Sequence, residues 1–166
     1  MDLKNFPAVL EHVLERADFR TDLYLFANLS MDTLDYTGPK VNEGSKGVLL
    51  GVGDPIRELP REFRGELPQG FKDPKTFCPG CLVVGGPHAQ QEPQAAERLA
   101  QSAAIKDWPL VVLVDDSERT TRSTINFLWT TFTRFEPAAD VHAARVTLVR
   151  QQPSFNPPIV IDARLK

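Results

Sequence analysis

The feature that most constrains the fold is an uninterrupted apolar run at residues 110–114, within the segment WPLVVLVDDS. Valine and leucine in an unbroken run, without polar alternation, are typical of a strand that is buried on both faces. The run ends in Asp115 and Asp116, and the next residue is a serine that can begin a helix. Ligands of open α/β sheets collect at such carboxyl edges. The segment therefore predicts an α/β domain with acidic side chains where a ligand can bind.

The remaining patterns add helices and strands around this central strand. Helical periods are found at residues 5–17, where Asn5 is a candidate cap, at 92–104 and at 125–132. Short apolar runs predict strands at 22–28, 47–52, 81–84, 145–149 and 159–162. The alternation over residues 81–149 predicts a right-handed, mostly parallel βαβαβ unit. We expect one α/β domain over residues 1–166, with three layers and a mostly parallel or mixed sheet flanked by helices.

Two details of this prediction concern weakly patterned segments. Ile125, Leu128, Trp129 and Phe132 repeat at i, i+3, i+4 and i+7, and predict a face by which a threonine-rich helix is held through packing. Residues 29–46 and 55–80 show no usable period and several prolines, so we expect irregular connections there. We expect Arg57, Arg61 and Arg64, in residues 55–80, to be solvated.

Length and composition limit the class of protein. A chain of 166 residues can bury a core without disulfides or metal. A net charge of −3, with 42% hydrophobic and 25% charged residues, argues against a dedicated nucleic-acid binder. No apolar run is long enough to cross a bilayer, and no leader pattern precedes the first helix. We therefore expect a cytoplasmic protein whose two cysteines remain thiols.

The acidic pair after the central strand is the first candidate for chemistry. Asp115 and Asp116 could hold a divalent cation, or accept a phosphoryl group as in receiver domains. A receiver domain also needs acids after its first strand and a lysine after a late strand. Asp32 and Asp35 follow the first strand only loosely, and Lys166 is terminal. Helix capping and the helix dipole explain the pair without catalysis, so both interpretations stay open.

The second candidate is the CPGC segment, in which Cys78 and Cys81 have the spacing of a redox pair or of half a zinc site. His88 is the one nearby histidine, so only three zinc ligands can be found locally. A redox pair usually begins a helix, whereas this segment precedes a strand. Two thiols in a structural turn are the simpler interpretation. The sequence contains no nucleophile elbow, HExxH motif or Walker loop.

Several of these segments together resemble the C-terminal domain of the UbiD-type decarboxylases. WPLVVLVDDSE is similar to the family's apolar strand with its acidic end, NFLWTTFTRFEPAADV to the helix that follows, and IVIDARLK to the terminal strand. DTLDYTGPKVNEGSKGVLLGVGDPIRELP and FCPGCLVVGGP also resemble the later half of the family. The resemblance extends from about residue 20 onward, and its motifs are structural rather than catalytic.

The resemblance implies a carboxy-lyase that uses prenylated FMN with Mn and K, bound by a preceding flavin domain. Nothing in this sequence matches that domain, so no catalytic or cofactor-binding residue is assigned and the chain is not expected to be catalytic alone. The resemblance also implies a substrate-pocket contact at Phe77 and Pro79. We therefore expect a small subunit or C-terminal domain that caps a larger UbiD-like catalytic partner in a homo- or hetero-oligomer. The alternative is a free-standing binding or regulatory module with a cation at Asp115 and Asp116.

Overall fold

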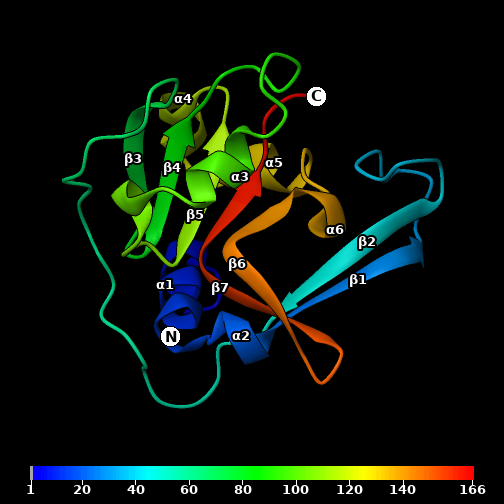
Figure 1. Ribbon diagram of the computed structural model, residues 1–166, viewed down its shortest axis with the longest axis horizontal. Coiled ribbons are helices and arrows are strands. Elements are labelled where there is room, and N and C mark those ends of the chain that lie inside the picture. Colours follow the sequence, from blue (N-terminus) through cyan, green and yellow to red (C-terminus); the bar gives the residue numbers. More distant parts are fainter. Residues whose placement is uncertain (1) are drawn as a thin grey trace.

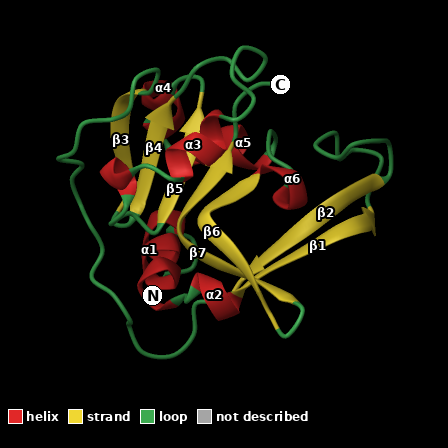
Figure 2. Ribbon diagram, in the orientation of Figure 1, coloured by secondary structure: helices red, strands yellow, loops and turns green. Residues whose placement is uncertain are grey.

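The computed structural model describes residues 2–166, which form a five-stranded mixed sheet and a separate two-stranded sheet (Figures 1 and 2). The five strands lie in the order β3-β4-β5-β7-β6. The central β4, β5 and β7 are parallel, and β3 and β6 pair antiparallel at the two edges. The strands are β3 (Lys72–Cys78), β4 (Cys81–Gly85), β5 (Leu110–Val114), β6 (Val141–Val149) and β7 (Gln152–Asp162). The predicted α/β class with a mixed sheet flanked by helices is confirmed.

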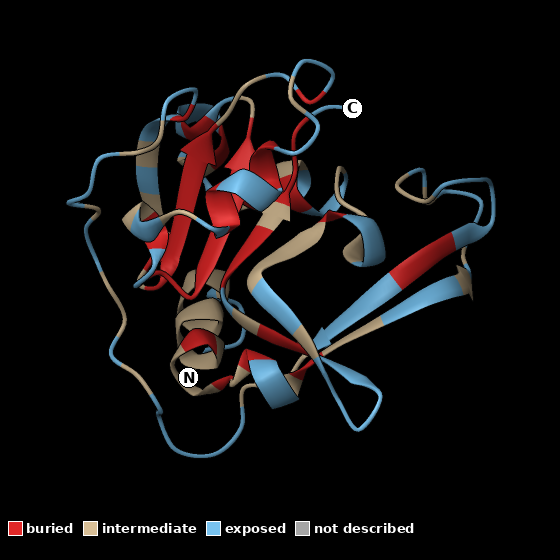
Figure 3. Cartoon of the chain, in the orientation of Figure 1, coloured by how far each residue is buried: buried red, intermediate tan, exposed pale blue. Residues whose placement is uncertain are grey.

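The predicted central strand, β5, is buried along its whole length, as is its neighbour β4 (Figure 3). Residues 111–114 of β5 have no exposed surface, because β4 and β7 cover its edges and side chains cover both faces. Val112 and Val114 point into one apolar cluster, and Val111 and Leu113 point into another. A strand without polar alternation thus fits a position that meets no water on either face.

Helices cover both faces of the large sheet. On one face, α1 and α5 contribute Leu14 and Phe127 to the apolar cluster. On the other, the small residues of α3 allow a close approach to the strands, and Ala95, Ala96 and Leu99 are fully buried. The helices are α1 (Phe6–Arg16), α2 (Phe19–Asp22), α3 (Ala95–Ala100), α4 (Ser117–Thr121), α5 (Thr124–Phe132) and α6 (Pro137–Asp140), with a 3₁₀ turn at Ala103–Ile105.

The N-terminal helix begins as the sequence indicated. The side chain of Asn5 accepts a hydrogen bond of 3.3 Å from the backbone N–H of Ala8, and Pro7 occupies the first turn, where its missing donor is not needed. The predicted helix at 5–17 is therefore confirmed. The signal was local, which is why sequence alone could find it.

The two-stranded sheet is an arm that extends away from the body of the molecule (Figure 1). It pairs β1 (Leu23–Ser30) with β2 (Glu43–Leu49), and α6 packs against both strands near the body. Asn28 interrupts the pairing in a left-handed conformation with φ of 56°. The predicted first strand at 22–28 is confirmed, but the second is wrong in position. The strand β2 spans residues 43–49 rather than the predicted 47–52, because its pairing with β1 runs from Glu43 to Leu49.

Two further predictions about the sheet are wrong. Residues 72–78 form β3, although Asp73 and Pro74 give it no strand pattern. Its antiparallel pairing with β4 supplies the stability that local propensity lacks. The strand predicted at 145–149, which is β6, was expected to complete the parallel βαβαβ unit, but β7 takes that position beside β5. The apolar end of β7 suits a buried place, and the half-exposed β6 suits an edge.

Candidate functional site

The predicted acidic pair lies at the carboxyl edge of the sheet, but its two carboxylates have different partners. Asp116 accepts a hydrogen bond of 2.9 Å from the backbone N–H of Arg119 and so caps α4. Asp115 forms an ion pair of 2.9 Å with Arg134 and accepts a 2.9 Å bond from the backbone N–H of Leu165. The capping interpretation is confirmed for Asp116 only, because Asp115 instead ties the C-terminal segment to the end of β5.

A cleft of about 370 Å³ opens beside Asp115 at this edge. Its walls come from the segments that follow β4, β5 and β7, as expected for the ligand-binding edge of a parallel sheet. The Oδ1 atom of Asp115 is buried and has no hydrogen-bond partner in the described chain. Within residues 2–166, no three His, Cys, Asp or Glu side chains gather as metal ligands. The lining residues are His88, Gln90, Gln91, Asp115, Leu165 and Lys166.

The CPGC segment is the tight turn between β3 and β4. The backbones of Cys78 and Cys81 are opposite each other in the strand pairing, and both side chains are free thiols. Gly80 has φ of +79°, a conformation that favours glycine. Both thiols are buried, and burial, followed by the hydrogen bond with Cys78, raises the pKa of Cys81 well above its ordinary value. The burial of both thiols favours two structural thiols in a turn, and the redox interpretation stays a prediction.

The local zinc site is not assembled either. His88 follows the far end of β4, whereas both cysteines lie at its beginning. A five-residue strand spans roughly 16 Å, far beyond a shared coordination sphere of about 2 Å. His88 is also exposed, while the thiols face the core.

The substrate-pocket contacts that the resemblance implies, Phe77 and Pro79, belong to a packed environment rather than to a mobile loop. The ring of Phe77 stacks on that of Phe127, with centroids 3.7 Å apart and planes 7° apart, and it also meets Phe6 at 6.3 Å. Phe77 thereby joins β3 to α5 and α1. Pro79 lies half-buried in the β3–β4 turn. A role of either residue in a substrate pocket stays a prediction.

One buried charge pair was missed by the sequence analysis. Arg164 is fully buried and forms a two-point ion pair with Asp162, with distances of 2.8 and 2.7 Å. Its guanidinium also donates to the carbonyls of Pro87 and Glu92, at 2.9 and 3.0 Å. The IDARLK motif therefore locks the segment after β4 to the end of β7. A resemblance at this motif was visible, but no local pattern indicates that an arginine is buried.

Arg57 corrects the expectation that the arginines of residues 55–80 are all solvated. Its guanidinium donates to the carbonyl of Leu14 and lies 5.6 Å from the centre of the Phe19 ring. Burial lowers the pKa of Arg57, and the nearby Asp18 opposes that shift. Arg61 and Arg64 are exposed, as expected. Arg57 thus anchors the long connection against α1 and α2.

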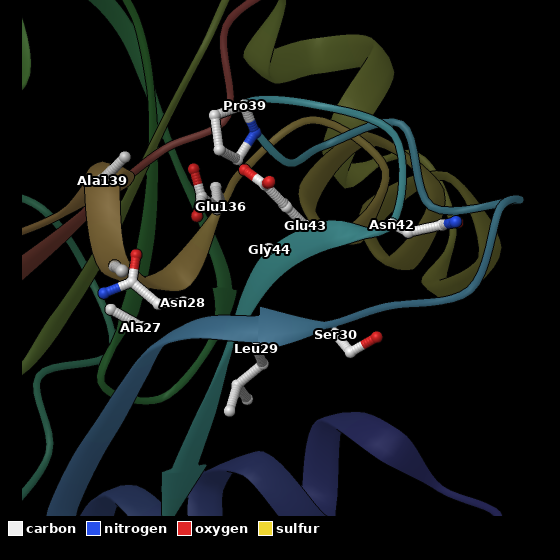
Figure 4. Close-up of a pocket in the computed structure, with 11 residues that line it drawn as sticks. Ala27, Asn28, Leu29, Ser30, Pro39, Asn42, Glu43, Gly44, Glu136 and Ala139 are labelled. Atoms are coloured by element: carbon white, nitrogen blue, oxygen red, sulfur yellow. The ribbon is translucent and has the colours of Figure 1, made fainter.

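A larger cleft of about 540 Å³ is lined by residues of the β1–β2 arm and of the segment around α6 (Figure 4). Carboxylates of Glu43 and Glu136 and the amides of Asn28 and Asn42 contribute to its walls. Ser45 Oγ of the arm accepts a 2.9 Å hydrogen bond from the backbone N–H of Ala138, which lines the cleft. This contact fixes α6 against the arm, so the cleft has a defined shape.

The apolar face predicted for 125–132 exists, but it faces solvent. Ile125, Trp129 and Phe132 are 77%, 70% and 52% exposed. The helix is held instead by Phe127, which is buried against Phe77, and by the buried Thr131. Leu128 of the predicted face packs against the core as expected, so the prediction is wrong for Ile125, Trp129 and Phe132. These three large apolar residues form an uncovered surface.

Comparison with known proteins tests the resemblance that the sequence carries. Residues 1–51 match the family described as 3-octaprenyl-4-hydroxybenzoate carboxy-lyase C-terminal domain. The match includes residues 1–20, which the sequence resemblance left out. The resemblance to the C-terminal domain of UbiD-type decarboxylases is thereby confirmed.

Particular relatives extend this similarity over the whole chain. An uncharacterized protein of Chlamydia trachomatis is 44% identical over 166 residues. A Chlamydia pneumoniae protein, named as a subunit of 4-hydroxybenzoate decarboxylase, is 42% identical over 164 residues, or 99% of the chain. The chain spans 28% of the length of each relative. No solved structure gives a significant match. No helix in the described residues is both long and apolar enough to span a membrane.

Proposed function

We propose that this chain is the small subunit or C-terminal domain of a UbiD-like aromatic or unsaturated acid decarboxylase or carboxylase. The observation that carries the proposal is its 42% identity, over nearly the whole chain, to the C. pneumoniae decarboxylase subunit. The chain corresponds to 28% of that protein, so the remaining part of the enzyme supplies a much larger body. In this proposal the chain packs on the flavin domain, caps the active site and supports assembly.

The structure gives physical support to a capping role rather than to independent catalysis. Asp115, Asp116 and Cys81, which the sequence suggested for chemistry, are committed to an ion pair, a helix cap and the core. In this proposal prenylated FMN, with Mn and K, binds to the larger partner. A rigid sheet with a projecting arm and an uncovered apolar face suits a body that closes over a partner and excludes water.

The test is purification of the tagged chain from its native cell, reading partner masses and the visible absorption of the eluate. We expect a larger protein with a flavin spectrum, and decarboxylation of an aromatic acid only when both polypeptides are present. A chain that elutes alone and colourless, and that fails to support decarboxylation by a larger UbiD-like protein, would refute the proposal.

A cation-binding module remains the alternative, because Asp115 lines the edge cleft and its buried Oδ1 atom has no hydrogen-bond partner in the described chain. Titration with Mg²⁺, Mn²⁺ or Ca²⁺ during thermal unfolding separates the two proposals, since a ligand that binds only the folded state raises the Tm. A rise that disappears in Asp115→Asn supports the cation module. An unchanged Tm removes it.

A further inference from the structure

We infer that the exposed face of α5, together with the groove beside it, is the surface on which the larger part of the enzyme docks. This inference rests on the proposed function and identifies the residues that meet the partner. The α5 face consists of Ile125, Trp129 and Phe132. The partner to which we commit is the polypeptide that corresponds to the rest of the relatives' length.

The three residues form one continuous surface. Spacings of four and three residues place them on the same side of the helix, about one turn apart. Scattered single apolar residues are common on protein surfaces, but an ordered row of three large side chains is not. Tryptophan is also among the residues that contribute most to binding at protein interfaces.

The row continues into a groove of about 320 Å³. The rings of Phe132 and Phe135 meet edge to face with centroids 5.7 Å apart, and both line the groove. Val48 of the arm forms part of the facing wall, and it is itself 43% exposed. Polar side chains of Asp35 and Lys46 border the groove. An apolar centre with a polar rim is the usual organisation of a protein interface.

The helix cannot rotate to bury this row within its own domain. Phe127, on the opposite side, is 2% exposed and stacked on Phe77. Ser123 also fixes the first turn by accepting a 3.1 Å hydrogen bond from the backbone N–H of Asn126. Rotation would expose Phe127 and break the cap. Only a separate body can therefore cover the row.

The relatives indicate which body that is. The chain matches them over nearly its full length yet spans only 28% of theirs. In those proteins the equivalent segment is joined to the rest of the enzyme, which is therefore present at a high effective concentration. A second copy of this chain has no such advantage at low protein concentration.

The binding test uses the part of the C. pneumoniae protein outside the matched segment, produced as a separate polypeptide. Its affinity is measured for the wild-type chain, for Ile125→Glu and for the control Leu148→Glu. The two positions are matched, because their side chains are 77% and 75% exposed and only Ile125 lies on the α5 face. We expect Ile125→Glu to weaken binding at least tenfold, and Leu148→Glu to change it less than about twofold.

A spectroscopic measurement reports on the same face without a disruptive substitution. The chain has two tryptophans, of which Trp108 is 3% exposed and Trp129 is 70% exposed. With 5-fluorotryptophan in this chain alone, we expect the ¹⁹F resonance of Trp129 to shift and lose solvent sensitivity when the partner binds. The resonance of Trp108 is expected to stay unchanged.

The outcomes distinguish the two proposals. If the partner polypeptide does not bind the wild-type chain, the proposed function and the docking face both fail. If it binds wild type, Ile125→Glu and Leu148→Glu equally and Trp129 stays solvent-sensitive, only the docking face is overturned. A Trp129 signal that changes with chain concentration alone would assign the face to a second copy and overturn our choice of partner.

Discussion

Replacing Arg164 with methionine is expected to lower the free energy of unfolding by about 3–5 kcal/mol, because it leaves the buried carboxylate of Asp162 without its cation. Arg164 is fully buried and the Asp162 side chain is 5% exposed, so water cannot substitute for the lost guanidinium. The carbonyls of Pro87 and Glu92 lose donors as well. At about 2–4 °C per kcal/mol for a chain of this size, the Tm should fall by roughly 6–20 °C.

Urea unfolding followed by circular dichroism measures this loss. Arg61→Met is the matched control, since Arg61 pairs with Glu11 but is 74% exposed, and its loss should be about 0.5 kcal/mol or less. Adding Asp162→Asn to Arg164→Met removes the stranded charge. The double variant should therefore lose at least about 1 kcal/mol less than the sum of the single losses. A loss in Arg164→Met no larger than in the control would refute the argument.

Three further predictions follow from the packing and from the shifted pKa values. Phe127→Ala should cost about 3–5 kcal/mol in urea unfolding because it removes a buried ring stacked on Phe77, and a loss below about 1 kcal/mol would contradict that packing. Burial lowers the pKa of His142 in the folded chain, so the unfolded chain binds the proton at a higher pH than the folded chain does. Stability should therefore fall as the pH drops below about 6.5, and less so in His142→Gln, when urea unfolding is compared between pH 5 and 8. Because the thiol pKa of Cys81 is raised, iodoacetamide at pH 8 should label it much more slowly in the folded chain than in urea, as read by peptide mass; equal rates would refute its burial.

Much of the fold could be predicted where the sequence carries a local signal. The unbroken apolar run of β5 has few structural solutions other than a central strand, and Asn5 at the head of a helical period marks the start of α1. The helical period at residues 92–104 likewise predicted α3. In each case the relevant physics acts within a few residues. Sequence was sufficient because these elements agree with their own local preferences.

The candidate site was less predictable because its contacts join distant parts of the chain. Arg164 meets Pro87 and Glu92 across more than 70 positions, and nothing near it in sequence signals burial. β3 has a polar sequence and exists because β4 pairs with it. The spacing of Cys78, Cys81 and His88 suggested shared ligands, yet β4 holds the histidine at its far end.

The sequence by itself determined the α/β class, the central strand and the identity of the apolar residues on α5. Only the tertiary structure decided which side of α5 the domain covers. A helical period shows that apolar residues share a face, but it cannot show whether that face meets the same chain or another one. Phe127 and Phe77 settled the matter by stacking in the core. That contact left Ile125, Trp129 and Phe132 on the surface, because one side of a helix can face only one neighbour.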